Sequence, residues 1–252
     1  MLTWAIVRRP GPDFARGLTT AALGEPDAAR MLAQHAAYAD ALRALGLEVE
    51  VLDPLPGFPD AYFVEDVAVV VPELAVVARP GAPSRLGEAE AIVPALGRHR
   101  ELARLEAPAT LEGGDVLVAG RTVFIGLSAR TNAEGAAQLA RLLEPHGYRC
   151  RTVPVAAGLH LKSSVSWLGG DLLLLAGRFA DRPEFRAFRR IVLDAAEEPA
   201  CNTLLVNGTL LTPAGFPEAR RQLEDARLPI AELDVSEVRK MDGGLTCLSL
   251  RL

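Results

Sequence analysis

A cysteine near the end of the chain is the first residue whose type and setting could do chemistry. Cys247 follows the pair Gly243–Gly244, and the alternation from Leu245 to Leu252 predicts a strand. A thiol presented just past a flexible double-glycine turn is suited to nucleophilic attack. Because a free cysteine is more often a small buried apolar residue, a catalytic role for Cys247 requires a partner elsewhere in the chain.

His160 is the best candidate for that partner. The other three histidines fall within, at the end of, or just after helical patterns, whereas His160 precedes a predicted hairpin. An imidazole beside a thiol can transfer protons, and a carboxylate such as Glu112 could fix the tautomer and orientation of the ring. The alternative is that His160 is a structural histidine. Cys201, which stands beside Asn202, is a second candidate nucleophile that we instead expect to be buried and structural.

Charged residues near these positions indicate the class of ligand. Glu65 and Asp66 are bracketed by apolar runs, and buried adjacent carboxylates need a cationic partner or a raised pKa. A guanidinium or ammonium group on a ligand would provide that partner. Arg85 and Arg130 follow two predicted hairpins at comparable points, where they could pair with a substrate carboxylate or simply lie on the surface.

The elements that must position these residues form a repeat. Four hairpins are predicted at Val67–Val71 with Leu74–Ala78, Val116–Ala119 with Thr122–Gly126, Ser164–Leu168 with Asp171–Leu175, and Thr203–Val206 with Thr209–Thr212. The Asn207–Gly208 pair favours a type I′ turn. Each hairpin is followed by a predicted helix, and further extended runs follow these; the helices are Arg85–Leu96, Ala133–His146, Pro183–Glu197 and Pro217–Ala226.

A fifth unit appears when the two ends of the chain are joined. The strand Thr246–Leu252 can pair with Thr3–Arg8, followed by a helix over Asp27–Leu45 and a strand over Leu47–Leu52. Joining the ends closes a ring without an exposed edge. We therefore predict one α/β domain over residues 1–252, with fivefold pseudosymmetric strand-strand-helix-strand units whose equivalent ends bring the thiol, the imidazole and the carboxylates into one cavity.

Composition narrows the function classes. The net charge of -5 comes without a basic stripe, which argues against nucleic acid as a partner, and no apolar run is long enough to span a membrane. The three cysteines include no CxxC pair, which argues against a disulfide framework and a cysteine-based zinc site. With no signal peptide evident, we expect a cytoplasmic protein. The glycine pairs match no phosphate-binding loop, and turn geometry is their simplest role.

Six segments, in order along the chain, resemble the dimethylarginine dimethylaminohydrolases of the guanidino-group modifying superfamily. They are Phe63–Val70, Arg79–Arg85, Leu111–Leu117, Gly126–Asn132, Gly158–Ser163 and Asp242–Cys247. The resemblance implies the pentein fold, a five-bladed α/β propeller. It also implies hydrolysis of Nω,Nω-dimethyl-L-arginine or Nω-monomethyl-L-arginine to citrulline and the methylated amine, through a covalent thiouronium intermediate and without a cofactor or metal.

The resemblance also implies a role for each site residue. Cys247 would be the nucleophile, His160 the general acid and base, and Glu112 the group that orients His160. The implied substrate-binding residues are Glu65 and Asp66 for the guanidinium, Arg85 and Arg130 for the α-carboxylate, Asp60 and the backbone of Leu18 for the amino-acid end, and Met241 for the pocket wall.

Two other functions remain open at this point. An arginine deiminase would share the fold and the cysteine, histidine and carboxylate set, although the longer chain and inserted helical region of that family have no counterpart here. A non-catalytic guanidine or amino-acid binding protein could use the same ring. The oligomeric state is open, with a homodimer among the alternatives.

Overall fold

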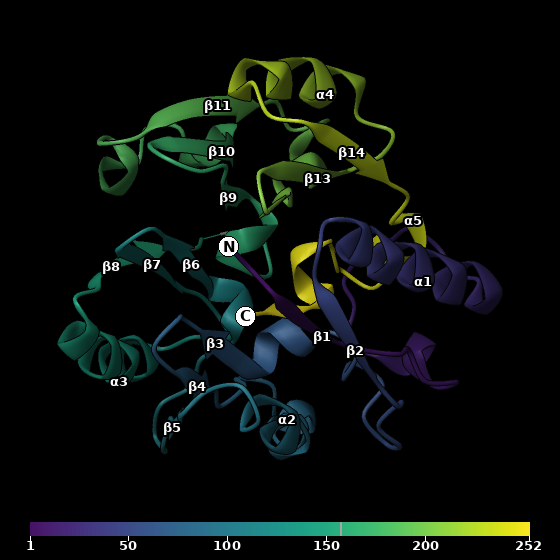
Figure 1. Cartoon of the computed structure of the whole chain (residues 1–252), viewed down its shortest axis with the longest axis vertical. Coiled ribbons are helices and arrows are strands. Elements are labelled where there is room, and N and C mark those ends of the chain that lie inside the picture. The colour runs from purple at the N-terminus through teal and green to yellow at the C-terminus, as the bar shows by residue number, and fades with distance from the viewer. Residues whose placement is uncertain (157) are drawn as a thin grey trace.

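Five three-stranded sheets surround a central axis in the computed structural model, which describes residues 1–156 and 158–252 (Figure 1). In each sheet the middle strand pairs antiparallel with one neighbour and parallel with the other. The predicted fivefold pseudosymmetric α/β ring is confirmed. Four of the sheets are β3(Ala68–Val70)-β4(Ala75–Val77)-β5(Leu102–Arg104), β6(Val116–Ala119)-β7(Thr122–Leu127)-β8(Arg149–Pro154), β9(Val165–Trp167)-β10(Leu172–Ala176)-β11(Arg189–Leu193) and β12(Leu204–Val206)-β13(Thr209–Pro213)-β14(Ile230–Leu233).

The fifth sheet joins the two ends of the chain. Its order is β15(Leu250–Arg251)-β1(Trp4–Arg8)-β2(Glu48–Leu52), so the first strand of the chain is the middle strand of its sheet. Thr3 N donates to Leu252 O at 2.8 Å, and Leu252 N donates to Trp4 O at 2.8 Å. The predicted closure of the ring is therefore confirmed.

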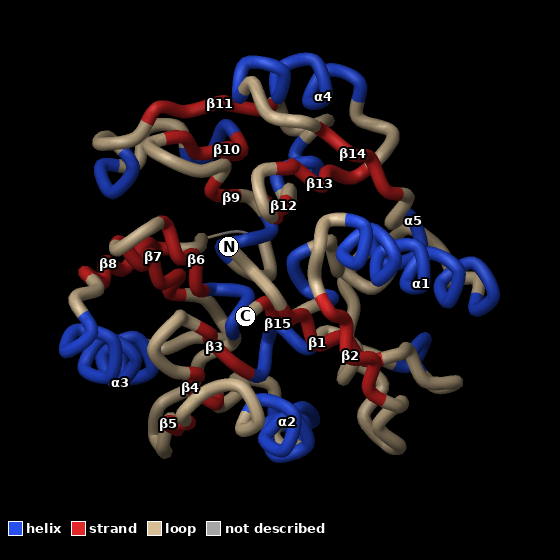
Figure 2. The backbone as a smooth tube through the Cα atoms, viewed as in Figure 1, coloured by secondary structure: helices blue, strands red, loops and turns tan. Residues whose placement is uncertain are grey.

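The longer α-helices lie at the rim of the ring, outside the sheets, whereas the helical segments near the centre are short 3-10 turns (Figure 2). The helices at the rim are α1(Ala28–Ala44), α2(Glu88–Leu96), α3(Ala133–Leu143) and α4(Pro217–Leu223), and α5(Ser236–Arg239) is a further short helix. Asp27 and Asn132 begin α1 and α3 as N-caps, because their side chains accept from the backbone N–H groups of Arg30 and Gly135. Apolar residues packed between sheets and helices form the core. None of the helices over the described ranges is long and apolar enough to cross a membrane.

The third unit departs from the prediction. We expected one helix over Pro183–Glu197, but this segment contains a 3-10 turn at Pro183–Phe185 and then β11. Residues Arg189–Leu193 are exposed, exposed, buried, exposed and buried, which is close to the alternation of a half-covered strand. The sheet needs this strand because β10 pairs with it in parallel over five residues. The predicted helix was therefore wrong.

The segment that carries the thiol also differs from its prediction. Thr246–Leu248 is a 3-10 turn, and the strand begins only at Leu250. Cys247 therefore lies on a tight turn before the strand, not within it. The predicted turn at Asn207–Gly208 is confirmed, since both residues have positive φ angles, 45° and 87°, as a type I′ turn requires.

Candidate active site

Short 3-10 turns precede the first strand of every unit, and they carry or flank five of the residues singled out from the sequence, namely Glu65, Asp66, Glu112, His160 and Cys247. Because the units are arranged around one axis, these turns bring residues distant in sequence together, as the repeat predicts. The five turns are Val64–Val67, Gly113–Asp115, Leu161–Ser163, Glu198–Cys201 and Thr246–Leu248.

One pocket at this end of the ring contains most of the predicted site. Of the ten residues predicted, eight line it: Leu18, Asp60, Asp66, Arg85, Arg130, His160, Met241 and Cys247. The pocket also contains Phe63, Leu159, Asp242 and Gly243. Glu112 lies directly behind His160, whereas Glu65 does not line the pocket.

His160 is a buried imidazole held between two carboxylates. Its Nε2 lies 2.8 Å from Glu112 Oε2, and its Nδ1 lies 3.8 Å from Asp66 Oδ1. Burial alone would lower the pKa of His160, but the neighbouring carboxylates of Asp66, Glu112 and Asp115 raise it to about 9. Burial would raise the pKa of Glu112, yet the hydrogen bond and charge of His160 lower it to about 2. The imidazole is therefore protonated at neutral pH and can donate a proton.

Asp115 also supports His160, a role that the sequence did not suggest. Its Oδ1 accepts from Leu161 N at 2.9 Å, directly after His160, and its Oδ2 accepts from Ser128 Oγ and Thr131 Oγ1 at 2.6 Å and 2.7 Å. Burial raises the pKa of Asp115, against the opposing effect of the His160 charge and these hydrogen bonds. The position of Asp115 in the Glu-Gly-Gly-Asp segment was the signal that could have identified it.

The double glycines permit close approach rather than unusual backbone angles, which corrects their predicted role at two of the three pairs. A Cβ on Gly114 would lie 2.5 Å from His160 Nδ1, and one on Gly243 would lie 2.3 Å from a ring carbon of Phe63. Gly169 and Gly170 do have positive φ angles, so turn geometry holds for that pair alone.

The thiol of Cys247 is partly buried beside two carboxylates. Burial, followed by the charges of Glu65 and Asp66, raises the pKa of Cys247 to about 12, although a backbone contact with Gly244 and the charge of Lys162 oppose this. A thiol with this pKa is uncharged at neutral pH. By contrast, Cys201 is fully buried, outside the lining of this pocket, and burial raises its pKa strongly.

Asp66 and Arg85 form a buried ion pair in the pocket wall. Arg85 Nη1 donates to Asp66 Oδ2 at 2.6 Å, and the Nε and Nη2 groups of Arg85 donate to Glu88. Burial would lower the pKa of Arg85, but these carboxylates raise it well above the ordinary value. Burial raises the pKa of Glu88 to about 7, in spite of Arg85. Arg85 is thus fixed in place at the pocket with two acidic partners.

The remaining predicted residues that line the pocket are Leu18, Asp60, Arg130 and Met241. Both carboxylate oxygens of Asp60 accept from Leu18 N, at 3.0 Å and 3.1 Å, and burial raises the pKa of Asp60. Arg130 Nη1 donates to Glu112 Oε1 at 3.3 Å. Met241 is buried in the wall. These contacts tie the loop containing Leu18 to the same pocket.

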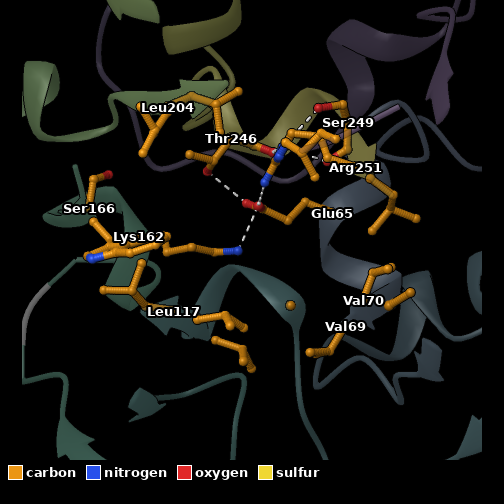
Figure 3. Close-up of a pocket in the computed structure, with 18 of the residues that line it drawn as sticks. Glu65, Val69, Val70, Leu117, Lys162, Ser166, Leu204, Thr246, Ser249 and Arg251 are labelled. Atoms are coloured by element: carbon orange, nitrogen blue, oxygen red, sulfur yellow. Dashed lines mark hydrogen bonds and ion pairs between the residues drawn. The ribbon is translucent and has the colours of Figure 1, made fainter. Parts of the chain in front are cut away.

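Glu65 lies in a second cavity (Figure 3), which we call the axial cavity because one strand of each of the five sheets contributes to its lining. Its carboxylate accepts from Thr246 Oγ1 at 2.7 Å and pairs with Lys162 Nζ at 2.6 Å and Arg251 Nη2 at 3.1 Å. The cavity has a volume of about 230 Å³ and is otherwise walled mainly by apolar residues, including Val69, Leu117 and Leu204. Glu65 thus lines a different cavity from Asp66, and its expected contact with a guanidinium stays a prediction.

Asp66, Glu112 and His160 also have the donor atoms of a possible metal site, within 4.8 Å of one another. Each donor already has a partner in the protein, because Asp66 pairs with Arg85, and Glu112 pairs with His160 and Arg130. These pairings favour proton transfer over metal binding as the function of the set.

Comparison with known proteins identifies the family. Residues 23–174 match a family model described as N,N dimethylarginine dimethylhydrolase, eukaryotic. The chain is 41% identical over 253 residues to an N(G),N(G)-dimethylarginine dimethylaminohydrolase of Pseudomonas aeruginosa, with all of both chains covered. The chain belongs to the dimethylarginine dimethylaminohydrolase family. A second dimethylaminohydrolase, from Streptomyces coelicolor, is 39% identical and covers 98% of this chain and 96% of its own.

Solved structures of dimethylaminohydrolases have the same fold. A cysteine-to-serine mutant of the Pseudomonas aeruginosa enzyme, complexed with citrulline, superposes with a TM-score of 0.98 at 40% identity, with both chains fully covered. A histidine-to-glycine variant in an adduct with S-methyl-L-thiocitrulline gives a TM-score of 0.96 at 41% identity, again over both full chains. The N-terminal domain of an arginine dihydrolase from cyanobacteria shares the fold alone, at 19% identity, with a TM-score of 0.88 and 98% of this chain and 97% of that domain covered.

Proposed function

We propose that this protein hydrolyses Nω,Nω-dimethyl-L-arginine to L-citrulline and dimethylamine, and Nω-monomethyl-L-arginine to L-citrulline and methylamine, without a cofactor. The observation that carries the proposal is that a thiol, an imidazole and a carboxylate, those of Cys247, His160 and Asp66, line one pocket. Full-length identity of about 40% to dimethylaminohydrolases supports the substrate class. The reaction needs a nucleophile, a proton donor and a partner for a guanidinium, and these groups can supply all three.

The substrate lies in the pocket with its guanidinium beside Asp66 and its α-carboxylate toward Arg85 and Arg130. Planar pairing between a guanidinium and a carboxylate suits Asp66, while Asp60 and the backbone of Leu18 contact the amino-acid end. Met241 packs against the ligand. Glu65 supports the turn that carries Cys247 instead of binding the guanidinium, because its carboxylate lies in the axial cavity with Lys162 and Arg251 and accepts from Thr246 Oγ1.

The first half of the reaction forms a covalent intermediate. The thiolate of Cys247 attacks the guanidinium carbon, which gives a neutral tetrahedral adduct. Protonated His160 donates its proton to the dimethylamino nitrogen, the C–N bond breaks, and dimethylamine leaves. A thiouronium cation remains on Cys247, and His160 is now neutral, with Glu112 holding its ring through the 2.8 Å contact.

The second half releases the product. Neutral His160 accepts a proton from water as the water oxygen bonds to the thiouronium carbon. The C–S bond then breaks while the hydroxyl group of the resulting adduct loses its proton to solvent, where the released amine can take it up. This step yields citrulline and regenerates the thiolate with His160 protonated. The same imidazole therefore acts first as an acid and then as a base.

The substrate itself activates the thiol. Burial and the carboxylates of Glu65 and Asp66 raise the pKa of Cys247 to about 12, so little thiolate is present at neutral pH before the substrate binds. A bound guanidinium cation brings a positive charge next to the sulfur and lowers that pKa. Binding of the substrate thus itself converts the thiol of Cys247 to the reactive thiolate.

The test is product release from the purified protein given dimethylarginine, monomethylarginine or arginine. We expect dimethylamine in step with citrulline, lost in Cys247→Ser and retained in the control Cys150→Ser, whose thiol is also partly buried but lies on β8. Citrulline and ammonia from plain arginine would instead indicate a deiminase. Ligand binding without turnover of any of the three would indicate a binding protein.

The proposal includes a setting for the enzyme. Residues 1–252 act as a single catalytic domain on a small methylated arginine in the cytoplasm, and a homodimer is the oligomeric state to test. The three cysteines are free, which suits a reducing compartment. Light scattering of the purified protein tests the dimer, and a single mass of about 26.8 kDa would contradict it.

A further inference from the structure

A buried amide on the fourth unit connects the turn that carries Cys247 with the segment that follows His160. Asn202 Oδ1 accepts from Thr246 N at 2.9 Å, and Asn202 Nδ2 donates to Thr246 Oγ1 at 3.1 Å. The same Nδ2 donates to Lys162 O at 3.0 Å. One side chain therefore bonds the residue before the nucleophile and the second residue after the imidazole.

These contacts use the particular chemistry of an amide. Asn202 is 6% exposed, and three hydrogen bonds engage its acceptor and its two N–H donors. A carboxylate of the same shape could accept from Thr246 N, but it could not donate to Lys162 O. The position therefore requires both a donor and an acceptor.

Gly244 makes room for this amide. A Cβ on Gly244 would lie 2.5 Å from both Cγ and Oδ1 of Asn202, which is closer than atoms can approach. A glycine is therefore needed at position 244, three residues before Cys247, because it allows the Asn202 side chain to reach the backbone of Thr246.

Thr246 is held from the opposite side as well. Its Oγ1 donates to Glu65 Oε2 at 2.7 Å, and Glu65 is itself fixed by Lys162 and Arg251 (Figure 3). Strand pairing does not hold Cys247 in place, because within the described chain β15 begins only at Leu250. The orientation of the 3-10 turn therefore depends on side chains from other units.

We propose that Asn202 is a positioning residue, which holds the turn of Cys247 at a fixed place relative to His160 by bonding both segments at once. This inference rests on the proposed function, in which these two residues share the chemistry. A small misplacement of reacting groups is costly, with losses on the order of 100-fold for about 1 Å.

The first test compares Asn202→Ala with Ser166→Ala. Ser166 is a matched control because its buried Oγ donates to Cys201 O at 2.6 Å. This hydrogen bond joins the third and fourth units, as the bond of Asn202 to Lys162 does, but it does not reach Thr246 in the fifth. We expect Asn202→Ala to lower kcat roughly 10- to 100-fold with KM changed less than about twofold, and Ser166→Ala to leave both within about twofold. A folded Asn202→Ala with nearly wild-type kcat, or an equal loss in Ser166→Ala, would overturn the proposal.

A second measurement does not depend on turnover. The alkylation rate of each thiol by iodoacetamide is followed by mass spectrometry without substrate. A loosened turn exposes the sulfur of Cys247 to water, so we expect faster alkylation of Cys247 in Asn202→Ala while kcat falls, with Cys150 unchanged. An unaltered rate at Cys247 would count against the proposal, even if wild-type protein proved inactive on dimethylarginine; that inactivity would by itself refute only the proposed function.

Variants at Thr246 decide the matter if Asn202→Ala does not fold. Thr246→Ser keeps the hydroxyl that bonds Asn202 and Glu65, whereas Thr246→Val removes it at similar volume. We expect the serine variant to retain kcat within about threefold and the valine variant to lose roughly tenfold or more. Equal activity of the two variants would contradict the proposal, as would additive losses in Asn202→Asp combined with Thr246→Val.

Discussion

Glu65 and Asp66 are adjacent carboxylates with equally buried side chains, yet they serve different cavities. Asp66 faces the pocket of Cys247 and pairs with Arg85, whereas Glu65 faces the axial cavity and pairs with Lys162 and Arg251. They can diverge because they stand on one 3-10 turn, where successive side chains point in different directions. Of two adjacent acidic residues, one can thus face the substrate pocket while the other stabilises the turn that carries the nucleophile.

The largest expected effect comes from removing the carboxylate on the pocket side. Asp66→Ala breaks a buried pair with Arg85 and removes the partner for the substrate guanidinium, so it should cost about 3–5 kcal/mol in kcat/KM. Steady-state kinetics with dimethylarginine measure this loss. The control is Asp53→Ala, since Asp53 is an exposed partner of Arg9 and should change activity by less than about 0.5 kcal/mol. Comparable losses in both variants would contradict the assignment of Asp66.

The next effect concerns His160 and pH. Its pKa in the folded protein is raised to about 9 from 6.5, so the stability it contributes is fully present below about pH 6.5 and is lost as pH rises through about 9. In Glu112→Gln the pKa of His160 falls, because a charged hydrogen-bond partner is lost. Denaturant unfolding across this range should show the loss, on the order of a few kcal/mol, moving to lower pH in the variant. The alkaline limb of the activity profile should move the same way, and an unmoved limb would argue against His160 as the acid.

Glu65→Gln should produce a smaller effect of a different kind. The variant keeps an acceptor for Thr246 but leaves Lys162 and Arg251 without their carboxylate, which should lower the free energy of unfolding by about 1–3 kcal/mol. Because Glu65 does not line the pocket, KM for dimethylarginine should change less than about twofold. A large rise in KM with unchanged kcat would show that Glu65 binds the guanidinium after all.

Lys162→Met should give the smallest loss of stability, and it tests the role of the axial cavity from the side of the cation. Glu65 retains Arg251 and Thr246, so we expect about 1 kcal/mol of lost stability. The pKa of Cys247 should rise in this variant and fall in Glu65→Gln, since Lys162 lowers that pKa and Glu65 raises it. Ultraviolet absorbance of the thiolate during pH titration measures both shifts, and shifts of the same sign in the two variants would refute this electrostatic account.

The fold could be predicted from the sequence wherever the local hydrophobic pattern agreed with the strand-strand-helix-strand repeat. Four hairpins, the ring closure and the convergence of Cys247 with His160 followed from periodicity and from the placement of polar residues before strands. The segment Pro183–Glu197 misled because arginines and apolar residues there fit a helical spacing, while the need of β10 for a parallel partner decided the outcome. A pairing requirement of that kind is set by the whole sheet and cannot be read from a local window.

The direction in which side chains on the 3-10 turns point could not be predicted from the sequence either. Nothing in the order of residues told which way Glu65 or Asp66 would face, because a 3-10 turn of three or four residues has no detectable period. The glycines of Glu112–Asp115 were visible, but their purpose depended on how closely His160 approaches, and that contact spans 46 residues between Gly114 and His160.

The closure of the ring has a consequence for the order in which the enzyme becomes competent. Cys247 precedes the strand that completes the fifth sheet, and this strand pairs with residues at the opposite end of the chain. During synthesis one edge of β1 therefore stays unpaired until Leu250 and Arg251 have been made. The thiol is made after every other group of its site and meets them only when the ring closes, so a partly synthesised chain carries the binding carboxylates without the nucleophile.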